Sequence, residues 1–121
     1  MARILVVEDN PDQLEIRTLL LENAGYEVRG ARSQEEAITM LEPPPAAAIV
    51  DLSLPDPAQG RSLVRELNSR IPETPIAVLT GWGDEIRKYP EQQYVTAVLE
   101  KPCPTRKLLE TLTRLIACLL L

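Results

Sequence analysis

Ala46-Ala-Ala-Ile-Val-Asp51 is an apolar run that ends on a carboxylate and has the length and composition of a buried β-strand. The prolines at 43–45 mark where this strand can begin. Other apolar runs also lead into polar or charged side chains: Ile4–Val7 before Glu8 and Asp9, Ile76–Leu79 before Thr80, and Ala97–Leu99 shortly before Lys101. Parallel strands share one carboxyl edge, where open α/β sheets place their sites. We therefore expect one acidic, metal-binding, phosphate-compatible pocket.

Strand and helix patterns alternate along the whole chain, which favours an α/β fold with a parallel sheet covered by helices on both faces. We predict strands at 3–8, 27–31, 46–51, 75–80 and 96–100. The 121 residues suggest one domain, 1–121, made of five β/α units and holding no output domain.

Capping and breaking residues set the predicted helices. The first helix begins at Asn10-Pro11 and ends at Gly25, with Leu14, Leu19, Leu20 and Leu21 on its buried face. The second runs from a capping box at Ser33 to the prolines at 43–45. The third follows a loop at 53–60 and ends near residue 70. The fourth is short, 83–89, because Pro90 interrupts it, and the last spans 105–120.

Composition excludes several classes of function. The net charge is -5 with 13 basic residues and no basic cluster, so direct binding of nucleic acid is not expected. The chain has no histidine, which removes histidine general bases and histidine metal sites. Cys103 and Cys118 have neither CxxC nor zinc spacing, as expected of reduced cysteines in a cytoplasmic protein. The apolar stretch 115–121 is far shorter than the about 20 residues that span a membrane.

The expected pocket has the groups that phosphoryl transfer to a carboxylate requires. Asp51 and Asp9 are suitable direct ligands for Mg²⁺, and Glu8 can act through water. Clustered carboxylates without a cation would raise one another's pKa, which itself favours a bound divalent ion. Lys101 offers a point charge and Thr80 a hydroxyl donor to a phosphoryl group while Asp51 attacks in line.

Each of these residues also has a purely structural interpretation. Asp51 and Thr80 could be turn residues, Glu8 and Asp9 could cap the first helix, and Lys101-Pro102 could be a solvated strand exit. Their joint occurrence at successive strand ends of one α/β chain favours the functional interpretation.

The chain resembles the receiver domains of bacterial two-component response regulators. The matching stretches are Ile4-Leu-Val-Val-Glu-Asp-Asn10, Val50-Asp-Leu-Ser-Leu-Pro-Asp56, Val78-Leu-Thr-Gly81 and Leu99-Glu-Lys-Pro102, and the resemblance covers essentially the whole chain. It implies a flavodoxin-like, doubly wound, five-stranded parallel sheet with strand order 2-1-3-4-5. It also implies a signalling module that catalyses only its own Mg²⁺-dependent phosphorylation and dephosphorylation.

The resemblance further implies roles for individual residues. Asp51 accepts a phosphoryl group from a partner histidine kinase or histidine phosphotransfer protein. Glu8, Asp9 and Asp51, with the backbone carbonyl of Ser53, organise Mg²⁺, while Thr80 and Lys101 bind the phosphoryl group.

The chain departs from the family pattern around the fifth strand. Receivers usually carry Tyr or Phe three residues before the strand-five lysine, where this chain has Val98. We expect the signal from Asp51 to be weakened or rerouted there. Pro90 should leave the fourth helix short and the usual partner-docking face atypical. Trp82, two residues after Thr80, could shield an acyl phosphate from water.

Other functions remain to be weighed. A degenerate receiver would act as a phosphate-independent protein-binding scaffold. A haloacid-dehalogenase-type phosphatase would need an acid where Ser53 stands, and a flavin-binding protein would need a Ser/Thr/Gly phosphate loop in place of Glu8-Asp9-Asn10-Pro11. The apolar helix at 105–121 could also contact a second copy or a further domain of a parent protein.

Overall fold

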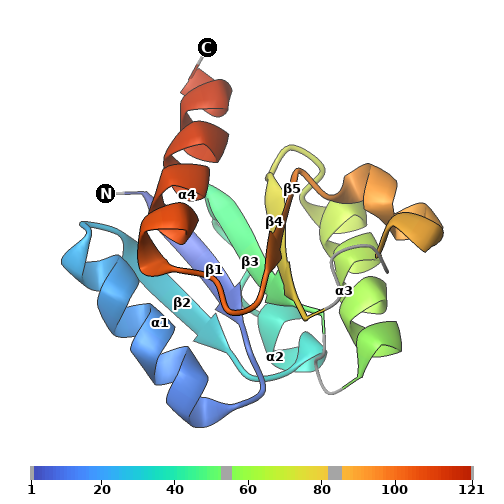
Figure 1. Ribbon diagram of the computed structural model, residues 1–121. Coiled ribbons are helices and arrows are strands. Elements are labelled where there is room, and N and C mark those ends of the chain that lie inside the picture. The colour runs from blue at the N-terminus through green and yellow to red at the C-terminus, as the bar shows by residue number, and fades with distance from the viewer. Residues whose placement is uncertain (1, 53–55, 82–85, 121) are drawn as a thin grey trace.

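A computed structural model describes residues 2–52, 56–81 and 86–120, together with the side chains of these residues up to 117. Five strands alternate with helices (Figure 1). The elements are β1 (Arg3–Val7), α1 (Pro11–Asn23), β2 (Glu27–Ala31), α2 (Gln34–Ile38), β3 (Ala47–Asp51), α3 (Pro57–Arg70), β4 (Ile76–Thr80), the 3₁₀-helices η1 (Ile86–Lys88) and η2 (Pro90–Tyr94), β5 (Ala97–Glu100) and α4 (Thr105–Leu120).

The strands form one sheet in the order β2-β1-β3-β4-β5, and every neighbouring pair is parallel. The predicted fold class and strand order are therefore confirmed, and the predicted strands agree with the observed ones to within a residue at each end. Helices α1 and α4 cover one face of the sheet, while α2 and α3 cover the other (Figure 1).

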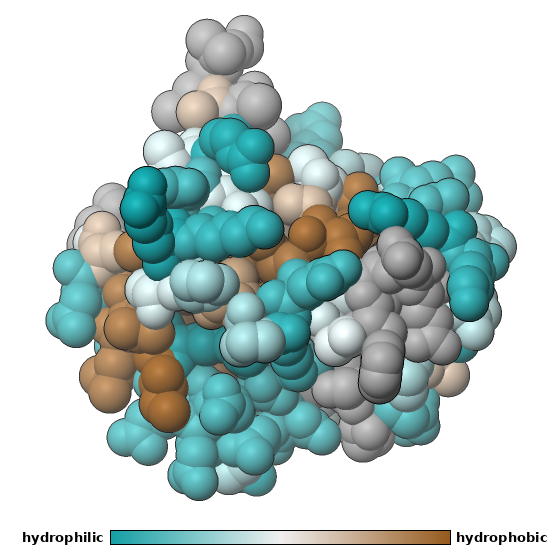
Figure 2. Space-filling model, in the orientation of Figure 1, coloured by the Kyte–Doolittle hydropathy of each residue, from teal (hydrophilic) through white to brown (hydrophobic). Residues whose placement is uncertain are grey.

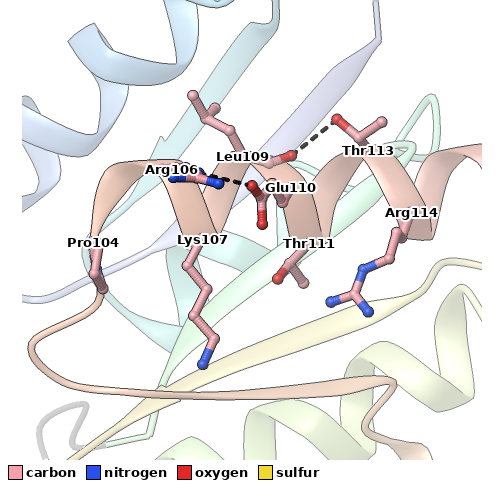
Figure 3. Close-up of a pocket in the computed structure, with 8 residues that line it drawn as sticks. All are labelled: Pro104, Arg106, Lys107, Leu109, Glu110, Thr111, Thr113 and Arg114. Carbon is pink, nitrogen blue, oxygen red and sulfur yellow. Dashed lines mark hydrogen bonds and ion pairs between the residues drawn. The ribbon is translucent and has the colours of Figure 1, made fainter.

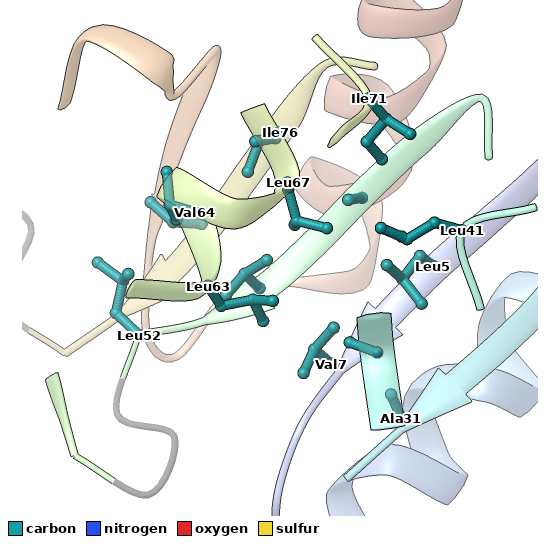
Figure 4. Packing of buried hydrophobic residues seen from close by; sticks show 14 of the residues in the cluster. Leu5, Val7, Ala31, Leu41, Leu52, Leu63, Val64, Leu67, Ile71 and Ile76 are labelled. Carbon is teal, nitrogen blue, oxygen red and sulfur yellow. The ribbon is translucent and has the colours of Figure 1, made fainter. Parts of the chain in front are cut away.

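Two buried clusters hold these layers together. Successive strand residues point to opposite faces. Leu5 and Val7 therefore join the cluster under α2 and α3, whereas Ile4 and Val6 join the cluster under α1 and α4. Figure 4 shows the first cluster, in which Leu63 and Leu67 of α3 pack over β3 and β1. Burial on both faces explains why the central strands are continuous apolar runs in the sequence.

Helix α1 begins and ends as its capping residues predict. The side-chain oxygen of Asn10 accepts hydrogen bonds from the N–H groups of Asp12 at 2.9 Å and Gln13 at 3.1 Å. Gly25 has a φ of 99°, which glycine adopts without strain. The predicted buried face is wrong at Leu19, which is 54% exposed, and Figure 2 shows hydrophobic atoms on the surface over α1.

The boundaries of α2 and α3 differ from the prediction. Helix α2 ends at Ile38, before the prolines, because local bonds serve its last carbonyls: the Thr39 hydroxyl donates to the carbonyl of Glu36 at 2.6 Å. Helix α3 begins at Pro57, inside the predicted loop. Its start is set by Asp56, whose carboxylate accepts from the N–H of Gln59 at 3.0 Å.

The predicted helix at 83–89 is wrong in type for its described part. Residues 86–88 and 90–94 form the 3₁₀-helices η1 and η2, and Pro90, which has no N–H to donate, stands at the start of the second. Glu91 of η2 is buried and pairs with two arginines of α3, at 3.7 Å from Arg61 and 3.3 Å from Arg65. The Arg61 guanidinium also lies 3.7 Å from the ring centre of Tyr89. Charge pairs therefore fasten this segment to α3.

Helix α4 packs its apolar stripe on the sheet. Leu108, Leu112 and Leu115 are buried, as their helical spacing predicts. The exposed sides of the helix carry polar side chains: Figure 3 shows Lys107 and Arg114 on one side, next to the buried Thr111, and the Arg106–Glu110 pair on another. Over the part of the chain that the structure describes, no helix is long and apolar enough to cross a membrane.

The packing predicts an unusual response at Gly60, inside α3. Alanine normally stabilises a helix interior relative to glycine by about 1 kcal/mol. A Cβ at position 60, however, would lie 2.4 Å from the carbonyl oxygen of Leu52 and 2.8 Å from its Cα. We expect Gly60→Ala to lower the free energy of unfolding by roughly 1–3 kcal/mol, measured by urea denaturation.

Gly81→Ala is the matched control, because a Cβ at Gly81 would meet no atom of the described residues within 4 Å. Its effect should stay within about 0.5 kcal/mol. A Gly60→Ala protein as stable as the wild type would contradict the close approach of α3 to Leu52.

Candidate functional site

The carboxyl edge of the sheet gathers the predicted site residues. The strands end level with one another, as the register pairs show: Val7 with Val50, Asp51 with Leu79, and Thr80 with Glu100. Beyond these pairs, the backbone N–H of Glu8 donates to the carbonyl of Ala31 at 2.9 Å and that of Lys101 to the carbonyl of Thr80 at 2.8 Å. The parallel register therefore fixes the backbone at four of the five predicted side chains, those of Glu8, Asp51, Thr80 and Lys101.

Asp51 is the most buried charged residue of this edge. Its side chain is 1% exposed, and its Oδ2 lies 2.6 Å from the Nζ of Lys101, which is 34% exposed. A charge-assisted hydrogen bond of this length compensates part of the cost of burying the carboxylate. Thr80 is also buried, at the end of the neighbouring strand. The structure thus brings the predicted acid and lysine into direct contact and places the threonine beside them.

Glu8 is buried next to Asp51 and has a cation of its own. It is 3% exposed, and its Oε1 accepts a hydrogen bond from the guanidinium of Arg17, a residue of α1 that is 14% exposed. Sequence reasoning missed Arg17. Two signals could have found it: Arg17 is the one basic residue of α1, and it stands two helical turns beyond the acids.

The environment of Glu8 favours its protonated form. Burial raises the pKa of Glu8, a hydrogen bond with Asp51 and the negative charge of Asp51 raise it further, and Arg17 lowers it, with a net rise. Two carboxyl groups in contact inside an apolar edge cannot both ionise freely without more positive charge. The described site therefore contains two carboxyl groups in contact, each paired with one internal cation.

The donor chemistry of this pair fits a hard divalent cation, which takes carboxylate oxygens as ligands. Within residues 2–52, 56–81 and 86–120, however, no group of three or more acidic, cysteine or histidine side chains is close enough to hold a metal ion. Asp9, the third predicted acid, is exposed at the rim. Ser53 and Trp82 lie outside the described residues.

A hollow adjoins the site between α1 and the connection from β5 to α4. Arg17 and Lys101 both line it, together with apolar side chains that include Ile16, Leu20 and Leu108. A second hollow runs along α4 and is lined by none of the predicted site residues (Figure 3). The first hollow is therefore lined by the two cations that pair with Glu8 and Asp51, although not by the acids themselves.

The profile of one protein family, the response regulator receiver domain, matches residues 4–113. This chain belongs to that family. Receiver domains are the signalling modules of two-component response regulators. The membership decides against the phosphatase and flavin-binding alternatives.

Relatives and solved structures agree with this assignment. This chain is 41% identical over 90 residues to the virulence transcriptional regulatory protein PhoP of Salmonella typhimurium. The matched region covers 71% of this chain and 40% of PhoP. The chain thus spans less than half the length of that relative. It superposes on a response regulator receiver domain protein from Clostridium thermocellum with a TM-score of 0.87, 27% identity and full coverage of both chains. The response regulator TrrA from Thermotoga maritima, crystallised with Mg²⁺ and BeF, gives a TM-score of 0.84 at 26% identity, over 95% of this chain and 99% of TrrA.

The raised pKa of Glu8 predicts a specific pH dependence of stability. A group whose pKa is higher in the folded chain contributes stability below its unfolded value, here 4.5, and loses that contribution as the pH rises through the folded pKa. Glu8→Gln keeps an uncharged side chain at every pH. We therefore expect the wild type to become less stable relative to Glu8→Gln as the pH rises above 4.5, in urea denaturation with EDTA present.

Glu66→Gln serves as the control for loss of one carboxylate, because the side chain of Glu66 is 42% exposed and paired with Arg70. The pH trend should be larger for Glu8→Gln than for this control. A trend of the opposite sign would show that Arg17 outweighs burial at Glu8.

Proposed function

We propose that Asp51 is the phosphoacceptor of this receiver domain and takes a phosphoryl group from the phosphohistidine of a histidine kinase or histidine phosphotransfer protein. The single observation that supports this most is the contact of the buried Asp51 carboxylate with Lys101 at 2.6 Å, at the edge where Glu8 and Thr80 are also buried. An aspartate that only shapes a turn would not need to be buried in contact with a lysine.

The proposed metal site consists of Glu8, Asp9, Asp51 and the backbone carbonyl of Ser53. Mg²⁺, when bound, supplies positive charge that offsets both the carboxylates and the phosphoryl group. The contact between the buried carboxyl groups of Glu8 and Asp51, which raises the pKa of Glu8, supports this assignment, because a bound divalent cation would offset their mutual repulsion. The Mg²⁺ and BeF complex of TrrA is further support from a relative of the same fold.

The residues of the chain have distinct roles in the proposed transfer. An oxygen of Asp51 attacks the phosphorus in line, a new O–P bond forms, and the N–P bond breaks, with the electron pair returning to the partner's imidazole. Lys101 is placed to exchange its contact with the carboxylate for one with a phosphoryl oxygen. Thr80 can donate its hydroxyl to another. Hydrolysis of the acyl phosphate by water returns the carboxylate, so the domain catalyses only its own phosphorylation and dephosphorylation.

The proposed setting is the cytoplasm, and the free thiol of Cys103 agrees with a reducing compartment. Residues 1–121 would act there as one receiver domain. A contact of the 105–121 helix with a second copy, or with a further domain of a parent protein, would use the polar sides of α4, since Leu108, Leu112 and Leu115 are already buried in the core.

Phosphorylation from a small phosphodonor tests the proposal. The wild type, incubated with Mg²⁺ and acetyl phosphate, should gain one acid-labile phosphate by intact mass, and Asp51→Asn should gain none. Lys101→Ala should lower the rate by about 10²–10³, the usual effect of removing one group that stabilises transferring charge. Asp12→Asn, a substitution of an exposed acid in the first turn of α1, is the matched control and should be phosphorylated like the wild type.

Two outcomes would contradict the assignment. A phosphate retained in Asp51→Asn would move the acceptor to another residue. A folded wild type that takes no phosphate, and whose Trp82 fluorescence does not respond to Mg²⁺ and beryllofluoride, would favour the phosphate-independent scaffold.

A further inference from the structure

Arg17 of α1 reaches the carboxyl edge of the sheet at Glu8 and Asp51, which we call the acid edge. It stands nine residues after Glu8, in the second turn of α1. Side chains on a helix slant toward its N-terminus, so a long side chain at this position can reach back over the first turn to the end of β1. The N-terminal part of α1 is otherwise acidic or neutral, with Asp12 and Glu15. Arg17 is thus the one cation that α1 gives to the site.

The contact is buried and makes the charges of the described site balance. Glu8 is 3% exposed and Arg17 14%, so water screens their attraction only weakly. The Nζ of Lys101, a 34% exposed side chain, pairs likewise with the buried carboxylate of Asp51. Two carboxyl groups thus have two internal cations, which leaves the edge close to neutral. A divalent cation entering beside Glu8 would meet a guanidinium already bound to that carboxylate.

We propose that Arg17 is an internal counter-cation that competes with Mg²⁺ for the Glu8 carboxylate and thereby sets the Mg²⁺ affinity of the domain. The inference rests on the proposed function, because it takes the acid edge as the metal site. Arg17 is a positioning residue in this scheme and touches no phosphoryl group. By linkage, any weakening of Mg²⁺ binding by Arg17 equals the weakening of the Arg17–Glu8 contact by Mg²⁺.

The hollow between α1 and the β5–α4 connection gives the guanidinium a place to go. Arg17 already lines it, along with Gln13, Cys103 and Thr105. Burial raises the pKa of the Cys103 thiol, while the positive charges of Lys107 and Arg17 oppose that rise, so the charge of Arg17 already acts across this hollow. A rotation of the side chain into the hollow would uncover Glu8 while the backbone of α1 stays in place.

Removal of the charge tests the proposal directly. Arg17→Met keeps most of the apolar stem and removes the guanidinium. We expect its Mg²⁺ dissociation constant, measured by titration calorimetry and by Trp82 fluorescence, to fall by roughly fivefold to a hundredfold, the usual range of coupling between two sites. Arg70→Met is the matched control: it removes an exposed arginine paired with Glu66 at the end of α3, and its affinity should equal that of the wild type.

Stability supplies a readout independent of phosphorylation. Without Arg17, Glu8 is buried beside Asp51 with less compensation, so Arg17→Met should melt at a lower temperature in EDTA. Saturating Mg²⁺ should raise the melting temperature of Arg17→Met more than that of the wild type. Arg17→Lys, which keeps a positive charge but only one nitrogen, should lie between the two in Mg²⁺ affinity and covers the case in which Arg17→Met does not fold.

The side chain of Arg17 can also be followed in the wild-type protein, with a substitution needed only to assign its signal. In a spectrum of the arginine Nε–H groups, the Arg17 signal, assigned by its loss in Arg17→Lys, should shift and sharpen on addition of Mg²⁺ as the side chain leaves Glu8. Equal or weaker Mg²⁺ binding by Arg17→Met and Arg17→Lys, or an Arg17 signal indifferent to Mg²⁺, would overturn the inference. The proposed function would survive that result if the wild type still binds Mg²⁺ and is phosphorylated on Asp51.

The remaining outcomes separate the two proposals as well. Mg²⁺ binding by Arg17→Met but not by the wild type would support the inference in its strongest form, because Arg17 would then close the site. A failure of all variants and the wild type to bind Mg²⁺ would overturn the inference together with the proposed metal site.

Discussion

The burial of two carboxyl groups at one edge of an apolar sheet is the constraint on which the rest of this structure depends. Glu8 follows β1 and Asp51 is the last residue of β3, and the parallel register brings them together with almost no exposure to water. An uncompensated buried charge costs several kcal/mol. Other elements must therefore deliver positive charge, which α1 does with Arg17 and the end of β5 does with Lys101. The positions of α1 and β5 relative to the central strands are thus tied to the site's electrostatics as well as to packing.

The segment between β4 and β5 is held by a similar arrangement away from the acid edge. Pro90 prevents a regular α-helix, and residues 90–94 form the short 3₁₀-helix η2. Glu91 turns inward between Arg61 and Arg65, and Tyr94 and Val95 pack against the cluster under α3. Val98, which stands where the family has an aromatic residue, is half-buried against that same cluster. Charge pairs to α3 and small apolar contacts replace the packing of a full helix and a ring.

Much of the fold could be predicted because its determinants are local in sequence. The central strands β1, β3 and β4 are buried on both faces, so each appears as a nearly unbroken apolar run, and the strand ends identify the site. The helix errors have local causes too, such as the Thr39 hydroxyl that ends α2 early and the Asp56 cap that begins α3 early. The contact between Glu8 and Arg17 could not be predicted in the same way. It depends on how α1 is rotated about its axis over the sheet, which the weak amphipathicity of α1, with Leu19 exposed, does not specify.

If the acids bind Mg²⁺ as proposed, an internal cation beside them changes what metal occupancy can do. A ligand shifts a protein only by the difference in its affinity for two states. If Glu8 and Asp51 had no arginine beside them, Mg²⁺ binding would only relieve the repulsion between the two carboxylates. With Arg17 on Glu8, the two states differ in the position of a side chain on α1, next to Ile16, which is 50% exposed. Under the proposed competition, metal occupancy is therefore expressed at the surface of α1 and not only at β5. On the α1 side, the side chain that would move is the large, charged Arg17. On the β5 side, the corresponding residue is the small Val98.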